Sequence, residues 1–252
     1  VSTNTAVGAS ALAANTTGLR MTAVGYQAGL TNSTNSYSAY FGYRAGASVT
    51  GDQNVAIGDR ALEGSASSTS GSVAIGQGAV ASVTSGYYLV GVGFQALNSN
   101  TTGIQNTGIG QQALYNSSTG SYNTAVGGQA LLNNTTASNN TAVGYQAGYT
   151  NTTGGGFSAF GYLSGYTYNS PSENFGSTFL GYVTGRYTTT GHDNAFVGGY
   201  AGNANTTGSY NTALGAASLY SNTTASNNTA VGYQAGYSNT TVSYTHLTLP
   251  TK

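Results

Sequence analysis

Apolar residues recur along this chain at a fixed distance from a recurring glycine. The phrase Asn-Thr-Ala-Val-Gly, or a close variant of it, returns about every 17 residues. When this glycine is numbered 0, position −1 holds Val, Ile, Leu or Phe in every repeat. Small and apolar side chains alternate around it with a period of two, which is typical of a short β-strand. The glycines at position 0 are Gly8, Gly25, Gly42, Gly58, Gly76, Gly93, Gly110, Gly127, Gly144, Gly161, Gly181, Gly198, Gly215 and Gly232.

A polar segment follows each of these strands. Asn, Thr and Gly dominate it, as in residues 15–18, 100–103 and 205–208. Asn and Gly tolerate positive φ, and Asn and Thr side chains cap neighbouring backbone groups, so this segment is predicted to be a corner. A circuit of 17 residues suits two short strands and two turns, stacked in parallel on the next circuit at about 4.8 Å. The pattern therefore predicts an all-β parallel β-roll, or β-solenoid, of about fourteen 17-residue coils.

The residues at position −1 are predicted to form the core of the roll. We therefore expect Val126→Asp to destabilise the fold more than Gln129→Asp, because an unpaired buried charge is costly. The small residues at positions −2 and 0 would let another chain approach closely, and we interpret them as an oligomer seam. The alternative is that they only fit a tight solenoid. The predicted core residues are Val7, Val24, Ile57, Ile75, Val92, Ile109, Val126, Val143, Val197, Leu214 and Val231.

The repeat covers residues 1–241, which we expect to form a single array. Because the chain begins and stops inside the pattern, we interpret the array as a fragment that is open at both ends. Residues 242–252 break the repeat and contain the only lysine of the chain. This segment resembles the peptide encoded by one frame of a transposon-end sequencing adapter. We therefore interpret it as a non-native tail, with a genuine exit segment as the alternative.

The composition excludes several classes of function. Charged residues make up 4% of the chain and the formal net charge is +0, which leaves no basic patch for nucleic acid or for an anionic membrane. No run of about 18 apolar residues occurs, so we expect no direct insertion into a membrane. The chain has no cysteine and no paired histidines, and we expect neither a metal site nor a cofactor. Residues 91–96 and 108–113 match the G-x-G-x-x-A dinucleotide pattern, but neither precedes a predicted helix.

Catalytic residues are not expected either. Three of the five acids, Asp52, Asp59 and Glu63, share a coil with Arg60, and we interpret this group as a solvated surface cluster. His192 is the only plausible general base. The side chains of adjacent residues in a strand or corner should point apart, so Asp193 should not orient its ring. The sequence predicts a protein that is not an enzyme.

Two repeats carry a resemblance to a known family. Residues 54–58 read Asn-Val-Ala-Ile-Gly and residues 72–76 read Ser-Val-Ala-Ile-Gly. They resemble the head repeat of YadA-like trimeric autotransporter adhesins, whose units read N/S-x-A-I/V-G followed by a small residue. Units of the form N-T-A-V-G-Y-Q-A-L with N-T-T-G spacers also resemble phage tail-fibre repeats. The resemblance implies a left-handed roll with three chains side by side, although the family repeats are usually a few residues shorter.

These features favour an adhesive rod over other classes. We expect a segment of a trimeric surface adhesin or phage tail fibre, extracellular on a cell surface or virion, that binds by repeated surface contacts. Its partners would be further copies of itself and a host surface protein or saccharide. The alternative is an ice- or crystal-binding β-solenoid, because Thr-Thr pairs at a fixed phase could line a flat face. Adjacent residues cannot both face one plane on a strand, which argues against it.

A ligand-binding surface is expected where the repeat is broken. The largest break is the 20-residue interval between Gly161 and Gly181, whose extra residues fall around 169–173. Aromatic rings supply contact area at low entropic cost, although the insertion could also be neutral drift. Asn-x-Thr/Ser triplets in the corners would be glycan acceptors only in a glycosylating host. The tyrosines near the insertion are Tyr162, Tyr166, Tyr168, Tyr182 and Tyr187.

Overall fold

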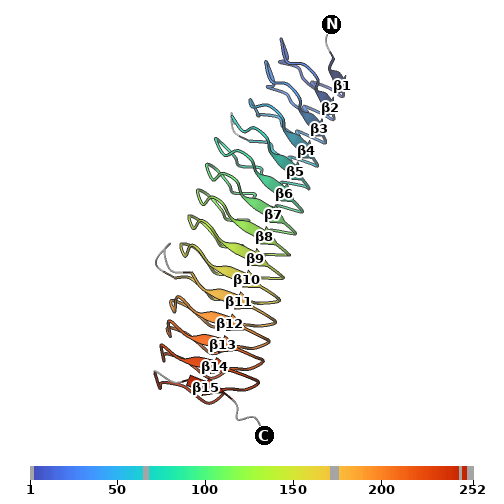
Figure 1. Ribbon diagram of the computed structural model, residues 1–252. Coiled ribbons are helices and arrows are strands. Elements are labelled where there is room, and N and C mark those ends of the chain that lie inside the picture. Colours follow the sequence, from blue (N-terminus) through green and yellow to red (C-terminus); the bar gives the residue numbers. More distant parts are fainter. Residues whose placement is uncertain (1–2, 65–67, 171–175, 244–245, 249–252) are drawn as a thin grey trace. The chain divides into compact units, whose positions relative to one another are not determined.

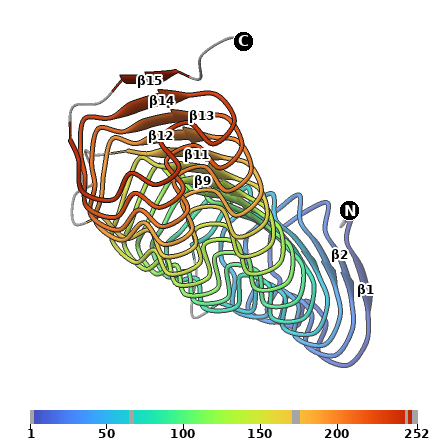
Figure 2. The ribbon, with the colours of Figure 1, turned by 90° about the horizontal axis from the view of Figure 1, so that it is seen from below.

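The computed structural model describes residues 3–64, 68–170, 176–243 and 246–248. They belong to two compact units, Val1–Asn123 and Thr124–Lys252. Within each unit, successive coils lie over one another and carry their strands on the same side (Figure 1, Figure 2). The described residues contain short strands and turns and no helix, so the predicted all-β parallel β-solenoid is confirmed.

Each strand is three residues long and pairs in parallel with the next strand of its unit. The register places equivalent repeat positions side by side, so that Val7 faces Val24 in the first unit. The strands of the first unit are β1 (Thr5–Val7), β2 (Thr22–Val24), β3 (Ala39–Phe41), β4 (Val55–Ile57), β5 (Val73–Ile75), β6 (Val90–Val92) and β7 (Thr107–Ile109). Those of the second unit are β8 (Thr124–Val126), β9 (Thr141–Val143), β10 (Ser158–Phe160), β11 (Thr178–Leu180), β12 (Ala195–Val197), β13 (Thr212–Leu214), β14 (Thr229–Val231) and β15 (His246–Thr248).

Within the described residues, each coil contains one strand and not the two that we predicted. The half that follows the glycine adopts positive φ at positions +2 and +4, as at Gln95 and Leu97, where φ is 53°. Residues in this region of φ cannot continue an extended strand. This half still bonds its neighbours, because the Gln95 N–H donates to the Gln77 carbonyl at 2.9 Å and the Leu97 N–H donates to the Ala113 carbonyl at 3.0 Å.

The recurring glycine is required by close contact between coils. At Gly127, φ is +131°, a region that side chains rarely adopt. A Cβ atom added there would lie 2.6 Å from the carbonyl oxygen of Gly144 in the next coil. The glycine therefore packs against the next coil of the same chain, and our interpretation of position 0 as part of an oligomer seam is wrong.

The interior of the coils is formed by position −2, and the prediction that position −1 forms the core of a single chain is wrong. Ala23 and Ala125 at position −2 have no exposed surface, so this position is not a seam either. By contrast, 56% of Val7 and 48% of Leu214 at position −1 are exposed. A period of two fixes which residues share a face but not which face is inside. The predicted core residues, all half-buried or exposed, are Val7, Val24, Ile57, Ile75, Val92, Ile109, Val126, Val143, Val197, Leu214 and Val231.

Positions −2 and +4 share the space inside the coils, so that a large side chain at one position accompanies a small residue at the other. Where position +4 is glycine, a large ring can fill the space, and a Cβ atom at Gly165 would lie 2.7 Å from Cδ2 of Phe179. Where position +4 is branched, position −2 is small, and a Cβ atom at Gly91 would lie 2.6 Å from Cγ2 of Val80. This exchange keeps a narrow interior filled without overpacking. It also explains one G-x-G-x-x-A match, because Gly91 makes room for an apolar side chain.

The last segment of the chain contributes a strand to the second unit. His246 of β15 pairs with Thr229 of β14, and the 17-residue register of the array is kept. The pairing concerns only the three residues of this strand. The prediction that residues 242–252 are not native stays a prediction. In sequence the glycine spacing continues between the two units, from Gly110 to Gly127.

Candidate functional site

Two of the tyrosines predicted to contact a ligand, Tyr162 and Tyr182, form part of a stacked row. The ring of Tyr162 stacks on Tyr145, with centroids 5.7 Å apart and planes inclined by 14°, and on Tyr182, with centroids 5.3 Å apart and planes inclined by 11°. Tyr182 in turn meets Tyr200 edge-on at 5.4 Å. The three stacked rings are half-exposed. Because their faces cover one another, the surface that they offer consists mainly of ring edges and hydroxyl groups.

Two more of these tyrosines surround an arginine. The guanidinium carbon of Arg186 lies 5.9 Å from the ring centroid of Tyr166 and 5.1 Å from that of Tyr187. Tyr166 also stacks on Tyr149, at 5.1 Å between centroids. Cation–π contacts of this kind hold the rings and the arginine in place on the surface. The structure thus places Tyr166 and Tyr187 around a cation that the sequence analysis did not single out.

Tyr168 cannot contact a ligand, and its prediction as a surface residue is wrong. It has no exposed surface and packs between Phe157, at 4.9 Å between ring centroids, and Phe179, at 5.4 Å. Burial raises the pKa of its phenol, and hydrogen bonds to Ser177 and Ser170 oppose that rise. The residue lies at position +7, which is asparagine in eight of the fourteen coils and is buried in six of those eight, and this phase is the signal that could have placed it inside. The insertion residues 171–173 lie outside the described part of the chain.

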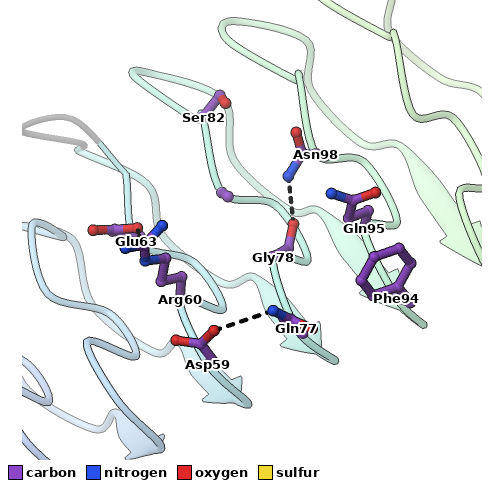
Figure 3. A pocket seen from close by; sticks show the side chains of 10 residues that line it. Asp59, Arg60, Glu63, Gln77, Gly78, Ser82, Phe94, Gln95 and Asn98 are labelled. Carbon is purple, nitrogen blue, oxygen red and sulfur yellow. Dashed lines mark hydrogen bonds and ion pairs between the residues drawn. The ribbon is translucent and has the colours of Figure 1, made fainter.

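The structure also forms a pocket in the first unit that sequence analysis missed. Its volume is about 340 Å³, and it opens over three successive coils (Figure 3). The pocket arises at Gly78, at position +2, where Arg60 and Gln95 in the adjoining coils carry long side chains. Gly78 has a φ of +63°, like the other residues at this position, so the backbone is unchanged and only the side chain is missing. A gap in a row of repeated side chains is therefore what makes the pocket.

Hydrogen bonds fix several polar groups around this pocket. Gln77 donates from Nε2 to the Asp59 carboxylate at 3.2 Å, and Asn98 donates from Nδ2 to the Gly78 carbonyl at 2.8 Å. Both bonds are drawn in Figure 3, where Phe94 and Gln95 lie on the same side of the pocket. These groups come from three consecutive coils, so the regular stacking of the solenoid is what holds them at their separations.

The charged residues near the pocket form a nearly neutral group. Glu63 pairs with Arg44 at 3.0 Å and with Arg60 at 3.8 Å. Asp52 does not join them, because its carboxylate accepts a bond from the Ser36 N–H at 2.8 Å in another part of the coil. The surface cluster predicted from sequence is therefore two separate features, and Asp59 and Glu63 of this cluster border the pocket.

His192 and Asp193 contact each other, contrary to our expectation that their side chains point apart. Nδ1 of His192 lies 3.0 Å from Oδ2 of Asp193. Asp193 has a φ of 53°, which turns its side chain toward that of its neighbour. The ring of His192 also meets Tyr210 edge-on at 5.3 Å. A histidine oriented by a carboxylate is one part of a catalytic arrangement, but it does not by itself identify a reaction.

The Asn-x-Thr/Ser triplets are part of the coil interior. Asn134 and Asn151 have no exposed surface, and their Nδ2 atoms donate to the carbonyls of Ala137 and Gly154 at 3.0 and 2.8 Å. Nδ2 is the atom that a glycan would occupy, so glycosylation is incompatible with the folded corner at these positions. Asn100, Asn205 and Asn222 are also fully buried, and Asn15 is half-buried.

The described residues contain neither a metal-binding group of side chains nor a membrane-spanning helix, and the chain matches none of the proteins compared with it. Among the described residues, no group of three or more His, Cys, Asp or Glu residues could hold a metal ion. No helix in the described ranges is both long and apolar enough to cross a membrane. Comparisons of the chain with family models, curated proteins and solved structures gave no match.

Proposed function

We propose that this chain is a segment of a non-enzymatic, extracellular adhesive rod that assembles from three copies. The observation that carries the proposal is a row of apolar side chains on the outer face of the strands. One such residue protrudes from each coil, at position −1. Monomeric soluble proteins rarely expose large contiguous apolar patches, and a patch of this kind marks an interaction surface.

The row is continuous within each unit because the strands pair in register. In the first unit, for example, Ile57 pairs with Ile75 and Ile75 with Val92. Position −3 lies on the same outer face, and in β4 to β6 it is also valine. The residues of the row that are more than a third exposed are Val7, Phe41, Ile57, Ile75 and Ile109 in the first unit and Phe160, Leu180, Leu214 and Val231 in the second.

A second copy of the same chain is the partner that fits this row best. The row carries no charge, and its period is that of the coils, so a parallel copy would present an apolar residue opposite each of its members. Association would bury the row along its whole length. Three copies, and a left-handed winding, are what the resemblance to YadA-like heads adds to this argument.

The adhesive part of the proposal follows from repetition. A repeated coil presents similar surface groups many times, and weak contacts made together give high avidity. The stacked tyrosines, the tyrosines around Arg186 and the pocket at Gly78 are three surfaces that such an assembly would present to a host protein or saccharide. An extracellular place on a cell surface or virion is the setting in which such a rod would act.

The ice- or crystal-binding alternative is favoured by one observation and opposed by another. Position −3 is threonine in several strands, such as β8 and β9, so threonine and valine alternate on the outer face there. The corner threonines on which the alternative first rested are already engaged. Thr101 donates from Oγ1 to the Ser118 carbonyl at 3.0 Å, and Thr206 donates to the Thr223 carbonyl at 3.0 Å.

Sedimentation equilibrium of the purified chain tests the assembly. We expect a trimer, and we expect the double variant Ile75→Asp, Ile109→Asp to be a folded monomer, because a charge on the apolar row opposes association. The control is Gln105→Asp, Gln111→Asp, which adds the same charge elsewhere on the surface. Aspartate already occurs at the equivalent repeat positions.

Two results would contradict the proposal. The first is a wild-type chain that stays monomeric at all concentrations. The second is loss of association in the control as well as in the double variant, since this would make net charge and not the row responsible. Clear thermal hysteresis by the wild-type chain would favour the ice-binding alternative instead.

A further inference from the structure

We propose that the pocket at Gly78 binds a neutral sugar ring of a glycan. The inference rests on the proposed adhesive function and names the class of ligand. Four observations support it: a missing side chain, a hydrogen-bond donor left by that gap, an uncovered aromatic ring, and the charges around the site.

The gap at Gly78 leaves a donor without its usual acceptor. In this row a glutamine donates to the glutamine of the preceding coil, as Gln112 does from Nε2 to Oε1 of Gln95 at 3.3 Å. The same bond joins Gln146 to Gln129 at 2.7 Å. The residue that would accept from Nε2 of Gln95 is Gly78, which has no side chain. Figure 3 shows the amide nitrogen of Gln95 on the side of Gly78.

Acceptors lie on the same pocket. Asp59, Gln77 and Asn98 line it and each carries an oxygen that can accept, and hydrogen bonds through Oδ2 of Asp59, Nε2 of Gln77 and Nδ2 of Asn98 fix these side chains. A sugar hydroxyl both donates and accepts, so it can satisfy a carboxylate and an amide at once. A small pocket with a few fixed polar groups is the form that small-molecule sites take, and 340 Å³ is at the small end of their range.

Phe94 supplies an aromatic ring that no ring among the described residues covers. It lies at position +1, where the tyrosines of other coils stack on one another, as Tyr26 does on Tyr43 at 5.4 Å. The residues at this position in the adjoining coils are Gln77 and Gln111, and 43% of Phe94 is exposed. The C–H groups of a sugar ring carry slight positive charge and pack against the negative face of an aromatic ring.

The charges around the pocket favour a neutral ligand. Among the described lining residues the one cation is Arg60, and it pairs with Glu63 at 3.8 Å, so this lining offers an anionic sugar no unpaired cation. The Asp59 carboxylate would repel such a sugar. A neutral sugar can instead donate hydrogen bonds from its hydroxyl groups to the Asp59 carboxylate.

Titration of the full chain with single sugars tests the inference. The probes are the neutral methyl glycosides of glucose, galactose and mannose and N-acetylglucosamine, with N-acetylneuraminic acid as the anionic and glucosamine as the cationic comparison. Binding is followed by saturation-transfer NMR and calorimetry. We expect at least one neutral sugar to bind, and Phe94→Ala to weaken its affinity about tenfold or more, as truncation of an aromatic anchor does.

The gap itself can be filled with little change to the coil, because a Cβ atom at Gly78 would meet only side-chain atoms, Nδ2 of Asn98 at 3.3 Å and Cγ of Gln95 at 3.5 Å. Gly78→Gln restores the residue that occupies this position in other coils, where φ is 52–58°, and we expect the variant to fold normally and to lose binding. The matched control is Ala217→Gln in the second unit, a position with a φ of 54°. This control should bind the sugar as the wild-type chain does.

The inference is overturned if no neutral sugar binds, if only the charged sugars bind, or if Gly78→Gln binds as well as the wild-type chain. Sedimentation separates this failure from failure of the rod. A trimer that binds no sugar contradicts only the inference, and a monomer that binds sugar through Gly78 contradicts only the proposed assembly.

Discussion

Adjacent residues of one three-residue strand have opposite environments in this fold. Ala125 at position −2 of β8 is fully buried inside its coil, whereas Val126 at position −1 lies on the outer face and is only half-buried. The larger and more apolar of the two is therefore the one outside. From β2 to β14, the contrast holds wherever position −2 is alanine or glycine. In β3, β11 and β12 a buried aromatic ring takes position −2 beside a glycine at +4, so the inside of a coil limits the combined volume of these two positions.

The two rows therefore have different roles. The inner row, together with position +4, fills the coil and determines whether a single chain folds. The outer row contributes less to folding of a single chain and is available for association. The predictions below separate these roles, from the largest expected effect on stability to the smallest.

A charge in the inner row should have the largest effect. Ala125→Asp places a carboxylate where no surface is exposed, and we expect it to cost about 3–5 kcal/mol of unfolding free energy. Val126→Asp, one residue further on, should cost about 1 kcal/mol or less in the monomer, because its side chain can reach solvent. Urea denaturation at low concentration, where association is absent, measures both. Equal losses would show that the two rows do not differ as described.

Substitution of the recurring glycine should cause the second-largest loss of unfolding free energy. Gly127→Ala introduces a Cβ atom 2.6 Å from the Gly144 carbonyl oxygen at a φ of +131°, and we expect a loss of about 2–3 kcal/mol. The control is Gly128→Ala in the same coil, where the new Cβ atom would only touch the Tyr145 ring at 3.5 Å. This control should stay within about 0.5 kcal/mol of the wild type. Thermal melting of the pair would contradict the account if both variants behaved alike.

The smallest effect concerns pH and the buried Tyr168. Burial raises the pKa of this phenol in the folded chain above its ordinary value of about 10. Its contribution to stability is therefore complete below about pH 10 and is lost as pH rises from there toward the folded pKa, because the unfolded chain ionises first. Tyr168→Phe removes this contribution, and Phe157 and Phe179 beside it already form an aromatic cluster.

We expect Tyr168→Phe to lose less stability than the wild-type chain between about pH 9 and about pH 11. Denaturation at the two pH values measures the difference. A loss equal to that of the wild-type chain would mean that Tyr168 is not the buried group responsible.

The sequence predicted the coil and its period but not the direction in which its side chains point. The spacing of the glycines gave the parallel stacking and the strand at −3 to −1 correctly. Alternation alone could not decide between Ala125 and Val126, and the more apolar residue was the wrong choice for the interior. The prediction of a second strand in each coil was also wrong, because residue types such as Gln95 and Leu97 do not indicate a positive φ.

The candidate sites were likewise predicted only in part from the sequence. Tyr162 and Tyr182 were two of the five tyrosines expected on the surface near the insertion, and the structure stacks them there. Tyr168 was wrongly predicted to lie on the surface because it was grouped with the nearby tyrosines. It lies at position +7, which Asn134 and Asn151 occupy in other coils. The pocket was missed because its cause is the absence of a side chain at Gly78, which is visible only when the coils are aligned by position.

Chemical labelling of single cysteines tests the central claim, that the outer row is an interface and the inner row is the core. The chain contains no cysteine, so Ala125→Cys and Val126→Cys each provide one reporter. A maleimide labels a thiol only when it can reach it. We predict that the cysteine at 125 reacts slowly at every concentration, and that the cysteine at 126 reacts fast in dilute monomer and slowly once the chain has associated. Fast labelling at 126 in the associated state would contradict the account.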